Sequence, residues 1–91
     1  MRTYKIRVLT DGLCHDGDKF ESSMEAALAR FTREILETKD YLVGYFLRTR
    51  EDVTGQTLQL LDCDGDEIIA ENYIPAFAVY DAAGVYSGAT R

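Results

Sequence analysis

The sequence predicts a two-layer α+β domain in which one helix packs on an antiparallel sheet. Three observations predict it: a segment of period two at residues 3–9, a capped helical stripe at residues 23–38, and an Asp-Gly turn at 64–65 between two apolar runs. The expected order is strand, helix, strand, strand, strand, followed by a short C-terminal hairpin. One helix covers only one face of such a sheet, so the other face is expected to be partly wet and to expose some Tyr and Leu surface.

The first strand is predicted at residues 3–9, where Tyr4, Ile6 and Val8 alternate with polar side chains. Residues 11–20 have no periodicity and are expected to form a loop. Ser22 and Glu25 have capping-box spacing, which predicts a helix from about residue 23 to 38. Its apolar stripe is expected at Met24, Leu28, Phe31 and Ile35, with Ala27 and Leu36 beside it.

Three further strands are predicted at residues 41–50, 56–62 and 67–73. The first of them is rich in aromatic and branched residues, which is typical of a central strand, and Gly44 would mark a bulge or a close helix contact. Residues 76–81 and 85–87 flank a second predicted turn and give the C-terminal hairpin.

Length and composition indicate one globular domain spanning residues 1–91. Hydrophobic residues make up 46% of the chain and charged residues 29%, which is ordinary for a folded domain. No apolar run approaches the ~18 residues of a membrane span, and the first residues lack the apolar stretch of a signal peptide. A cytoplasmic protein without a membrane partner is expected. Two cysteines far apart in such a chain are expected to be free thiols, with a bridge between Cys14 and Cys63 as the alternative.

Catalytic and metal motifs are missing from the sequence. Cys14 and His15 are adjacent, whereas a nucleophile and its base are neighbours in space rather than in sequence. The spacing Asp62-x-Asp64-x-Asp66 starts like a calcium loop but lacks Gly at position six and Glu at position twelve. We therefore expect no enzyme activity, no cofactor and no metal site.

Negative charge is concentrated in two short segments, which is the strongest functional signal. Residues 11–21 hold four acids and one lysine, and residues 62–71 hold five acids and no base. Together they carry −8, whereas the whole chain carries −6. This pattern argues against direct nucleic-acid binding and favours a basic protein surface as partner. Exposed carboxylates act mainly through on-rate and specificity, so an aromatic anchor is also expected, and Tyr73, Tyr80 and Tyr86 are candidates.

With its small size, its acidic turns and its strand–helix–three-strand order over residues 3–74, the chain resembles small phage-encoded anti-CRISPR proteins. The resemblance implies a non-enzymatic inhibitor in the host cytoplasm, which occupies a basic groove of a host protein or ribonucleoprotein complex such as a CRISPR effector. The charge argument alone supplies the candidate binding residues, which are Asp16, Asp18, Asp62, Asp64, Asp66, Glu67, Glu71 and Tyr73.

Two alternatives use other surfaces. The first is a small structural or adaptor module that forms a homodimer through the open sheet face, so that either a monomer or a homodimer is expected. The second is a nucleic-acid binder that uses Arg7, Arg48 and Arg50.

Overall fold

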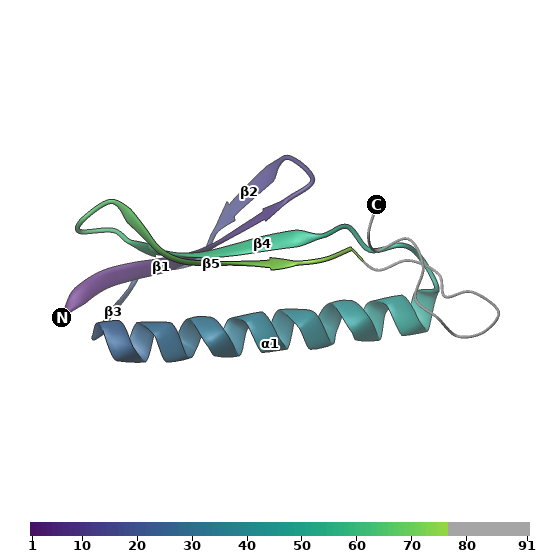
Figure 1. Ribbon diagram of the computed structural model, residues 1–91, viewed down its shortest axis with the longest axis horizontal. Coiled ribbons are helices and arrows are strands. Elements are labelled where there is room, and N and C mark those ends of the chain that lie inside the picture. Colours follow the sequence, from purple (N-terminus) through teal and green to yellow (C-terminus); the bar gives the residue numbers. More distant parts are fainter. Residues whose placement is uncertain (77–91) are drawn as a thin grey trace.

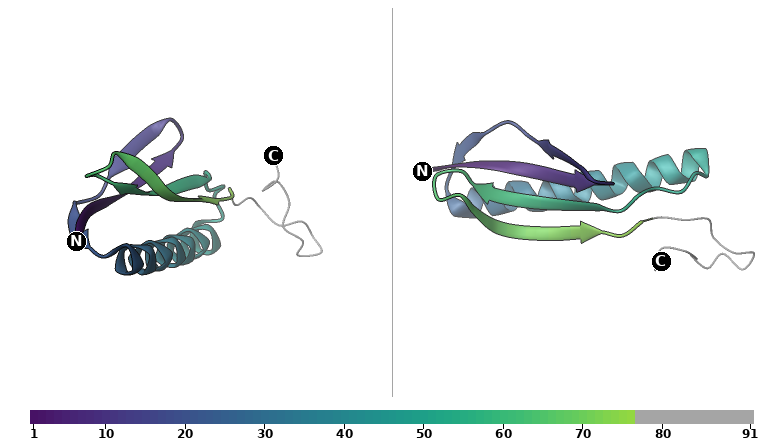
Figure 2. Two further views of the ribbon diagram at one scale, coloured as in Figure 1. Left: turned by 60° about the vertical axis from the view of Figure 1, so that its left-hand side comes forward. Right: turned by 90° about the horizontal axis from the view of Figure 1, so that it is seen from above.

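The computed structural model describes residues 1–76 and confirms the α+β class (Figure 1). Within that range the elements are β1 (Arg2–Thr10), β2 (Leu13–Asp16), β3 (Phe20–Ser22), α1 (Met24–Thr49), β4 (Gln56–Asp62) and β5 (Glu67–Ile74). All strand pairs are antiparallel, and α1 lies under one face of the sheet (Figures 1 and 2). The order along the described chain is therefore strand, strand, strand, helix, strand, strand.

The central pair of the sheet is β1 with β4, and the sheet order is β2-β1-β4-β5. Strand β3 continues along the same edge of β1 that β2 uses. Arg7 faces Asp16 and Tyr4 faces Phe20, so two residues of β1 lie opposite three residues, 17–19. The extra residue is a β-bulge, which bends this edge of the sheet between β2 and β3.

The predicted loop at residues 11–20 is therefore wrong. Asp11 and Gly12, both with positive φ, make a tight hairpin turn, and β2 and β3 pair with β1. Asp and Gly adopt this conformation at low cost, which is why the pair ends β1 and starts β2. The mixed polar sequence of β2 hid its strand, because all four of its residues are exposed.

The predicted strand at residues 41–50 is also wrong, because α1 continues without a break to Thr49. Leu42 and Phe46 are buried and lie one turn apart on the stripe of Ala27 and Phe31. No helix-stopping residue follows residue 38, and the end comes only at Arg50, whose φ is 59° and whose N–H donates to the Phe46 carbonyl. Gly44 accordingly sits inside a helix and marks no bulge.

The N-terminal cap of the helix differs from the prediction by one residue. Ser23, rather than Ser22, accepts a hydrogen bond from Ala26 N–H at 3.2 Å. Met24, Leu28 and Leu36, which were expected on the core stripe, are exposed by 42%, 38% and 58% and lie outside the buried core.

The core lies between α1 and the sheet face that alternate residues of β1 and β4 share. Its buried members are Tyr4, Ala27, Phe31, Leu42, Phe46, Val53, Leu58, Leu60 and Ile74. Strands β4 and β5 occupy the predicted positions, and residues 63–66 join them in the predicted hairpin turn. The predicted C-terminal hairpin, apart from Ala76, lies outside the described residues, as do Tyr80 and Tyr86.

Candidate functional site: the acidic segments and the open sheet face

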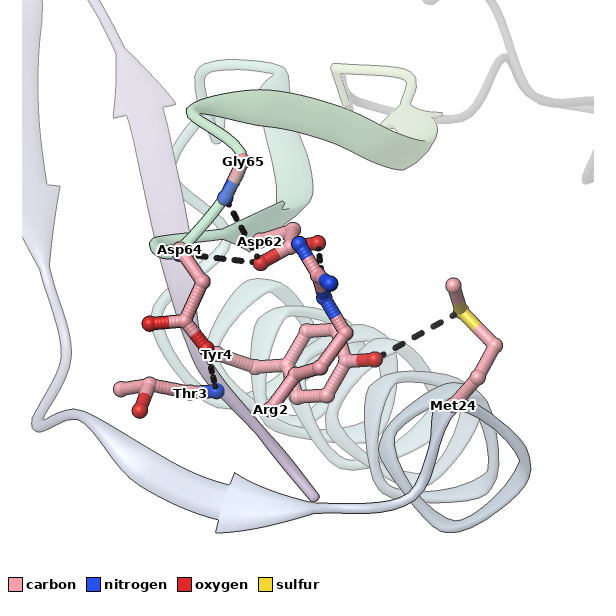
Figure 3. Close-up of polar contacts among 7 residues, drawn as sticks. All are labelled: Arg2, Thr3, Tyr4, Met24, Asp62, Asp64 and Gly65. Carbon is pink, nitrogen blue, oxygen red and sulfur yellow. Dashed lines mark hydrogen bonds and ion pairs between the residues drawn. The ribbon is translucent and has the colours of Figure 1, made fainter.

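The β4–β5 turn is built around one buried carboxylate, Asp62, which is 4% exposed (Figure 3). Its Oδ2 accepts from Arg2 Nε at 2.7 Å, and its Oδ1 accepts from the N–H groups of Asp64 and Gly65 at 3.0 and 3.2 Å. A carboxylate that bonds N–H groups two and three residues ahead fixes a turn locally. Asp62 therefore shapes the turn from inside rather than facing a partner.

Asp64 ties the same turn to β1. Its Oδ2 accepts from Thr3 N–H at 2.9 Å (Figure 3). The neighbouring Cys63 N–H donates to the Thr3 carbonyl at 2.8 Å. Asp66 then closes the turn with a φ of 52°, a left-handed conformation that Asp tolerates better than most residues. The turn is thus held at several points before Asp66 and Glu67 reach solvent.

Burial and hydrogen bonding act on the Asp62 carboxyl in opposite directions. Burial raises its pKa, whereas the bonds from Arg2 and from the turn N–H groups lower it, and the net result is a pKa below its ordinary value. Asp62 is therefore charged at neutral pH, because Arg2 and the N–H groups of the turn stabilise the carboxylate inside the fold.

In the other acidic segment, Asp16 forms a bridge to two bases of β1. Its carboxylate accepts from Lys5 Nζ at 2.8 Å and from Arg7 Nε at 2.6 Å, and Arg7 Nη2 lies 3.3 Å from the second oxygen. These bonds, the one from Arg7 above all, hold the Asp16 pKa well below its ordinary value. Asp16 lies opposite Arg7 in the β1–β2 register, so all three side chains share the open sheet face.

The two acidic segments meet over this open face. Lys5, Arg7 and Lys19 line a polar hollow of about 250 Å³, and Asp66 of the β4–β5 turn borders the same hollow. Asp11, by contrast, sits in the β1–β2 turn at the other end of β1. The acidic side chains therefore gather in part around the basic residues of β1, and within residues 1–76 two of them, Asp16 and Asp62, form ion pairs with bases of β1.

The remaining predicted site residues differ in their availability. Glu71 accepts a hydrogen bond from Gln59 Nε2 at 3.3 Å. Among residues 1–76, Asp18, Asp66 and Glu67 make no ion pair. Tyr73 is 61% exposed but lies opposite Thr57, six residues along β5 from Glu67, or about 20 Å away. The structure does not bring this tyrosine to the acidic turn, where the anchor was expected.

The open face is more polar than the sequence suggested. Leu61 is buried there, and its large exposed apolar side chains are Ile68 and Tyr73 of β5. The residues of the nucleic-acid alternative are divided between the layers: Arg7 lies on the open sheet face, whereas Arg48 and Arg50 lie at the end of α1.

The thiols and the lone histidine do not assemble a reactive site in the described chain. Cys14 and Cys63 are both free. In the part of the chain that the structure describes, no three His, Cys, Asp or Glu side chains lie close enough to hold a metal ion. His15 belongs to β2 and lines a pocket between the sheet edge and α1. Over the same residues, the one helix lacks the apolar length that crossing a membrane requires.

Comparisons of the chain with protein-family models, with curated protein sequences and with solved structures found no match.

Proposed function

We propose that this protein is a non-enzymatic inhibitor that binds a basic protein surface through the acidic β4–β5 turn. The observation that carries the proposal is that two acids of this turn hold its backbone and two others are free to contact a partner. Asp62 and Asp64 accept hydrogen bonds that hold the backbone of the turn. Asp66 and Glu67 are exposed and make no ion pair within residues 1–76. Carboxylates on a rigid turn lose little conformational freedom on binding, which favours specific recognition of Lys and Arg.

The partner class follows from the charge and from the resemblance to anti-CRISPR proteins. A groove that binds nucleic acid is lined with Lys and Arg, and carboxylates that take the place of phosphates block it without any reaction. A nucleic-acid-handling complex of the host, such as a CRISPR effector, is the partner we propose. The net charge of −6 speeds encounter with such a surface, and high salt weakens it.

The test removes the charge only of the two unpaired acids. The double variant D66N/E67Q changes the charge by +2 and leaves Asp62 and Asp64 in place, and Asn tolerates the left-handed φ of position 66 as Asp does. The matched control is E37Q/D40N on α1, which makes the same change of charge at exposed positions outside the turn. Both variants and the wild type are immobilised, and a bacterial lysate that contains a CRISPR effector is passed over them at low salt.

We expect the wild type and the helix control to retain the effector complex, and the turn variant to lose most of it. The added wild-type protein should also inhibit target-DNA binding by the purified complex. Equal retention by the turn variant would refute the role of the turn. Failure of the wild type to retain or inhibit any nucleic-acid-handling complex would refute the proposed function itself.

A further inference from the structure

Strand β2 is a sheet edge without a partner strand in the described part of the chain. It pairs with β1 on one side, and it lies at the margin of the sheet, seen from above in Figure 2. An edge of this kind presents unpaired backbone N–H and C=O groups, which another strand can bond. Which residues present them follows from the register.

The register identifies Cys14 and Asp16 as the residues whose backbone faces outward. Gly17 N–H donates to the Ile6 carbonyl at 2.8 Å, so the position next to the Arg7–Asp16 pair, on the side away from the turn, is hydrogen-bonded. Antiparallel pairs alternate between bonded and non-bonded, which makes Val8–His15 the next bonded pair toward the turn. Cys14 and Asp16 fall in the non-bonded pairs, and their N–H and C=O groups therefore point away from β1.

A pocket of about 260 Å³ lies on the helix side of this edge. Its apolar part is formed by Ile6, Val8 and Phe20, which are only partly buried because β2 places His15 and Gly17, rather than aliphatic side chains, over them. The volume is below the usual 300–1,000 Å³ of sites for drug-sized ligands and suits one apolar side chain. A side chain that fills it would extend the core to the edge of the sheet.

The charges around the pocket select the kind of strand that fits. Its rim holds His15, Asp18, Arg30 and Glu34, and Asp16 is already neutralised by Lys5 and Arg7. The Arg30 guanidinium lies 4.0 Å from the centre of the Phe20 ring, whereas Asp18 and Glu34 make no ion pair within residues 1–76. A second copy of this chain would bring another −6 to the same place, which disfavours pairing of β2 with itself.

We propose that the β2 edge binds an extended segment of a partner protein that carries an apolar residue flanked by basic residues. The segment adds a strand to the sheet by bonding Cys14 and Asp16, and its apolar side chain enters the pocket beside Phe20. Basic residues two positions away point to the same side, where Asp18 and Glu34 lie. This surface is separate from the β4–β5 turn, so the inference does not depend on the proposed function.

The probe for the test is the peptide acetyl-Thr-Lys-Thr-Leu-Thr-Lys-Thr-amide, which places Leu and both Lys on one side of a strand. Isotope-labelled full-length protein is titrated with it, and the amide resonances are followed by NMR. We expect shifts at the amides of Cys14 and Asp16 and at the pocket residues, without shifts at Glu67. Replacing Leu by Ala in the peptide should weaken binding by about tenfold, because the apolar contact is lost.

Two variants separate strand pairing from mere charge attraction. The substitution Cys14→Pro removes an outward N–H without breaking a bond to β1, and it should weaken binding by about three- to tenfold, whereas Cys14→Ala keeps the N–H and serves as control. Should the proline variant fail to fold, N-methylation of alternate peptide residues gives the same information. Methylation of the peptide residues whose N–H groups face β2 should abolish binding, whereas methylation of the residues between them should not.

Several results would overturn the inference. These are no amide shifts at saturating peptide, equal binding of both N-methylated series, and shifts concentrated on the β4–β5 turn. Shifts of the Cys14 and Asp16 amides on simple dilution would assign the edge to a second copy. Contacts between β2 and residues 77–91 in the free protein would assign it to the chain's own C-terminal segment.

Discussion

At the scale of single residues, Asp16 shows that bases of the same chain neutralise some of its acidic side chains. One carboxylate neutralises two cations of β1, and its pKa is held well below the ordinary value of 3.8, first by the hydrogen bond from Arg7 and then by that from Lys5. A carboxyl whose pKa is lower in the folded than in the unfolded protein stabilises the fold above the unfolded pKa. That contribution disappears as the pH falls through the folded pKa.

The prediction concerns Asp16→Asn, which removes this titration. At neutral pH we expect the variant to unfold at lower urea than the wild type. The difference should shrink from about pH 4 downward, because the unfolded wild-type chain then takes up a proton at Asp16 that the folded protein does not yet bind. Urea titrations at several pH values measure it. Asp18→Asn is the control at neutral pH, because Asp18 makes no ion pair within residues 1–76 and its loss should leave the urea midpoint close to that of the wild type. A deficit for Asp16→Asn that stays constant down to about pH 2 would contradict the assignment.

Single residues also show how much of the candidate site could be predicted from the sequence. Composition shows that residues 11–21 and 62–71 are acidic, but it does not show which carboxylates remain available. Asp62 and Asp64 look alike in the sequence as members of an acidic turn. Only the approach of Arg2 and Thr3, some sixty residues earlier, turns both into structural groups. Because register across the sheet sets those contacts, local sequence patterns cannot supply them.

At the scale of elements, the helix shows why the predicted fold class was correct although the strand predicted at residues 41–50 was wrong. The periodic stripe at Ala27 and Phe31 predicts a helix correctly, whereas the aromatic and branched residues after Lys39 favour a strand by composition. The spacing of Leu42 and Phe46 continues the helical stripe, and tertiary packing on that stripe decides the conformation. Strands β4 and β5 were predictable because an Asp-Gly turn separates two apolar runs.

The second prediction uses Gly44, which lies inside α1 on its exposed side. A Cβ added there meets no atom within 4 Å, so Gly44→Ala removes backbone freedom from the unfolded chain without a clash. We expect a gain of about 0.5–1 kcal/mol in the free energy of unfolding, measured by urea denaturation.

The control for this substitution is Gly12→Ala in the β1–β2 turn. The added Cβ also finds open space there, but the φ of +77° is unfavourable for alanine, and the variant should lose stability. A destabilised Gly44→Ala variant would argue that residues 41–49 are not helical in solution.

At the scale of the whole molecule, the helix and the sheet share one core, although the chain builds them from distant segments. Phe46 of α1 is 2% exposed and belongs to the same buried cluster as Leu58 of β4 and Ile74 of β5. The far face of the sheet carries the ion pairs of Asp16 with Lys5 and Arg7, and within residues 1–76 it has no second cluster of buried apolar residues. The stability of both layers therefore depends on a single interface.

The last prediction tests that dependence with two aromatic residues of α1. Phe46→Ala should lower the free energy of unfolding by about 3–5 kcal/mol, because it empties a buried position that the rigid sheet cannot fill. Tyr41→Ala, at a position that is 67% exposed on the same helix, should change it by less than about 0.5 kcal/mol. Hydrogen exchange of the folded Phe46→Ala variant should accelerate equally for the slowest amides of α1 and of β4, since neither layer has a core of its own. Retained protection of β4 beside a fast-exchanging helix would show instead that the sheet is stable by itself.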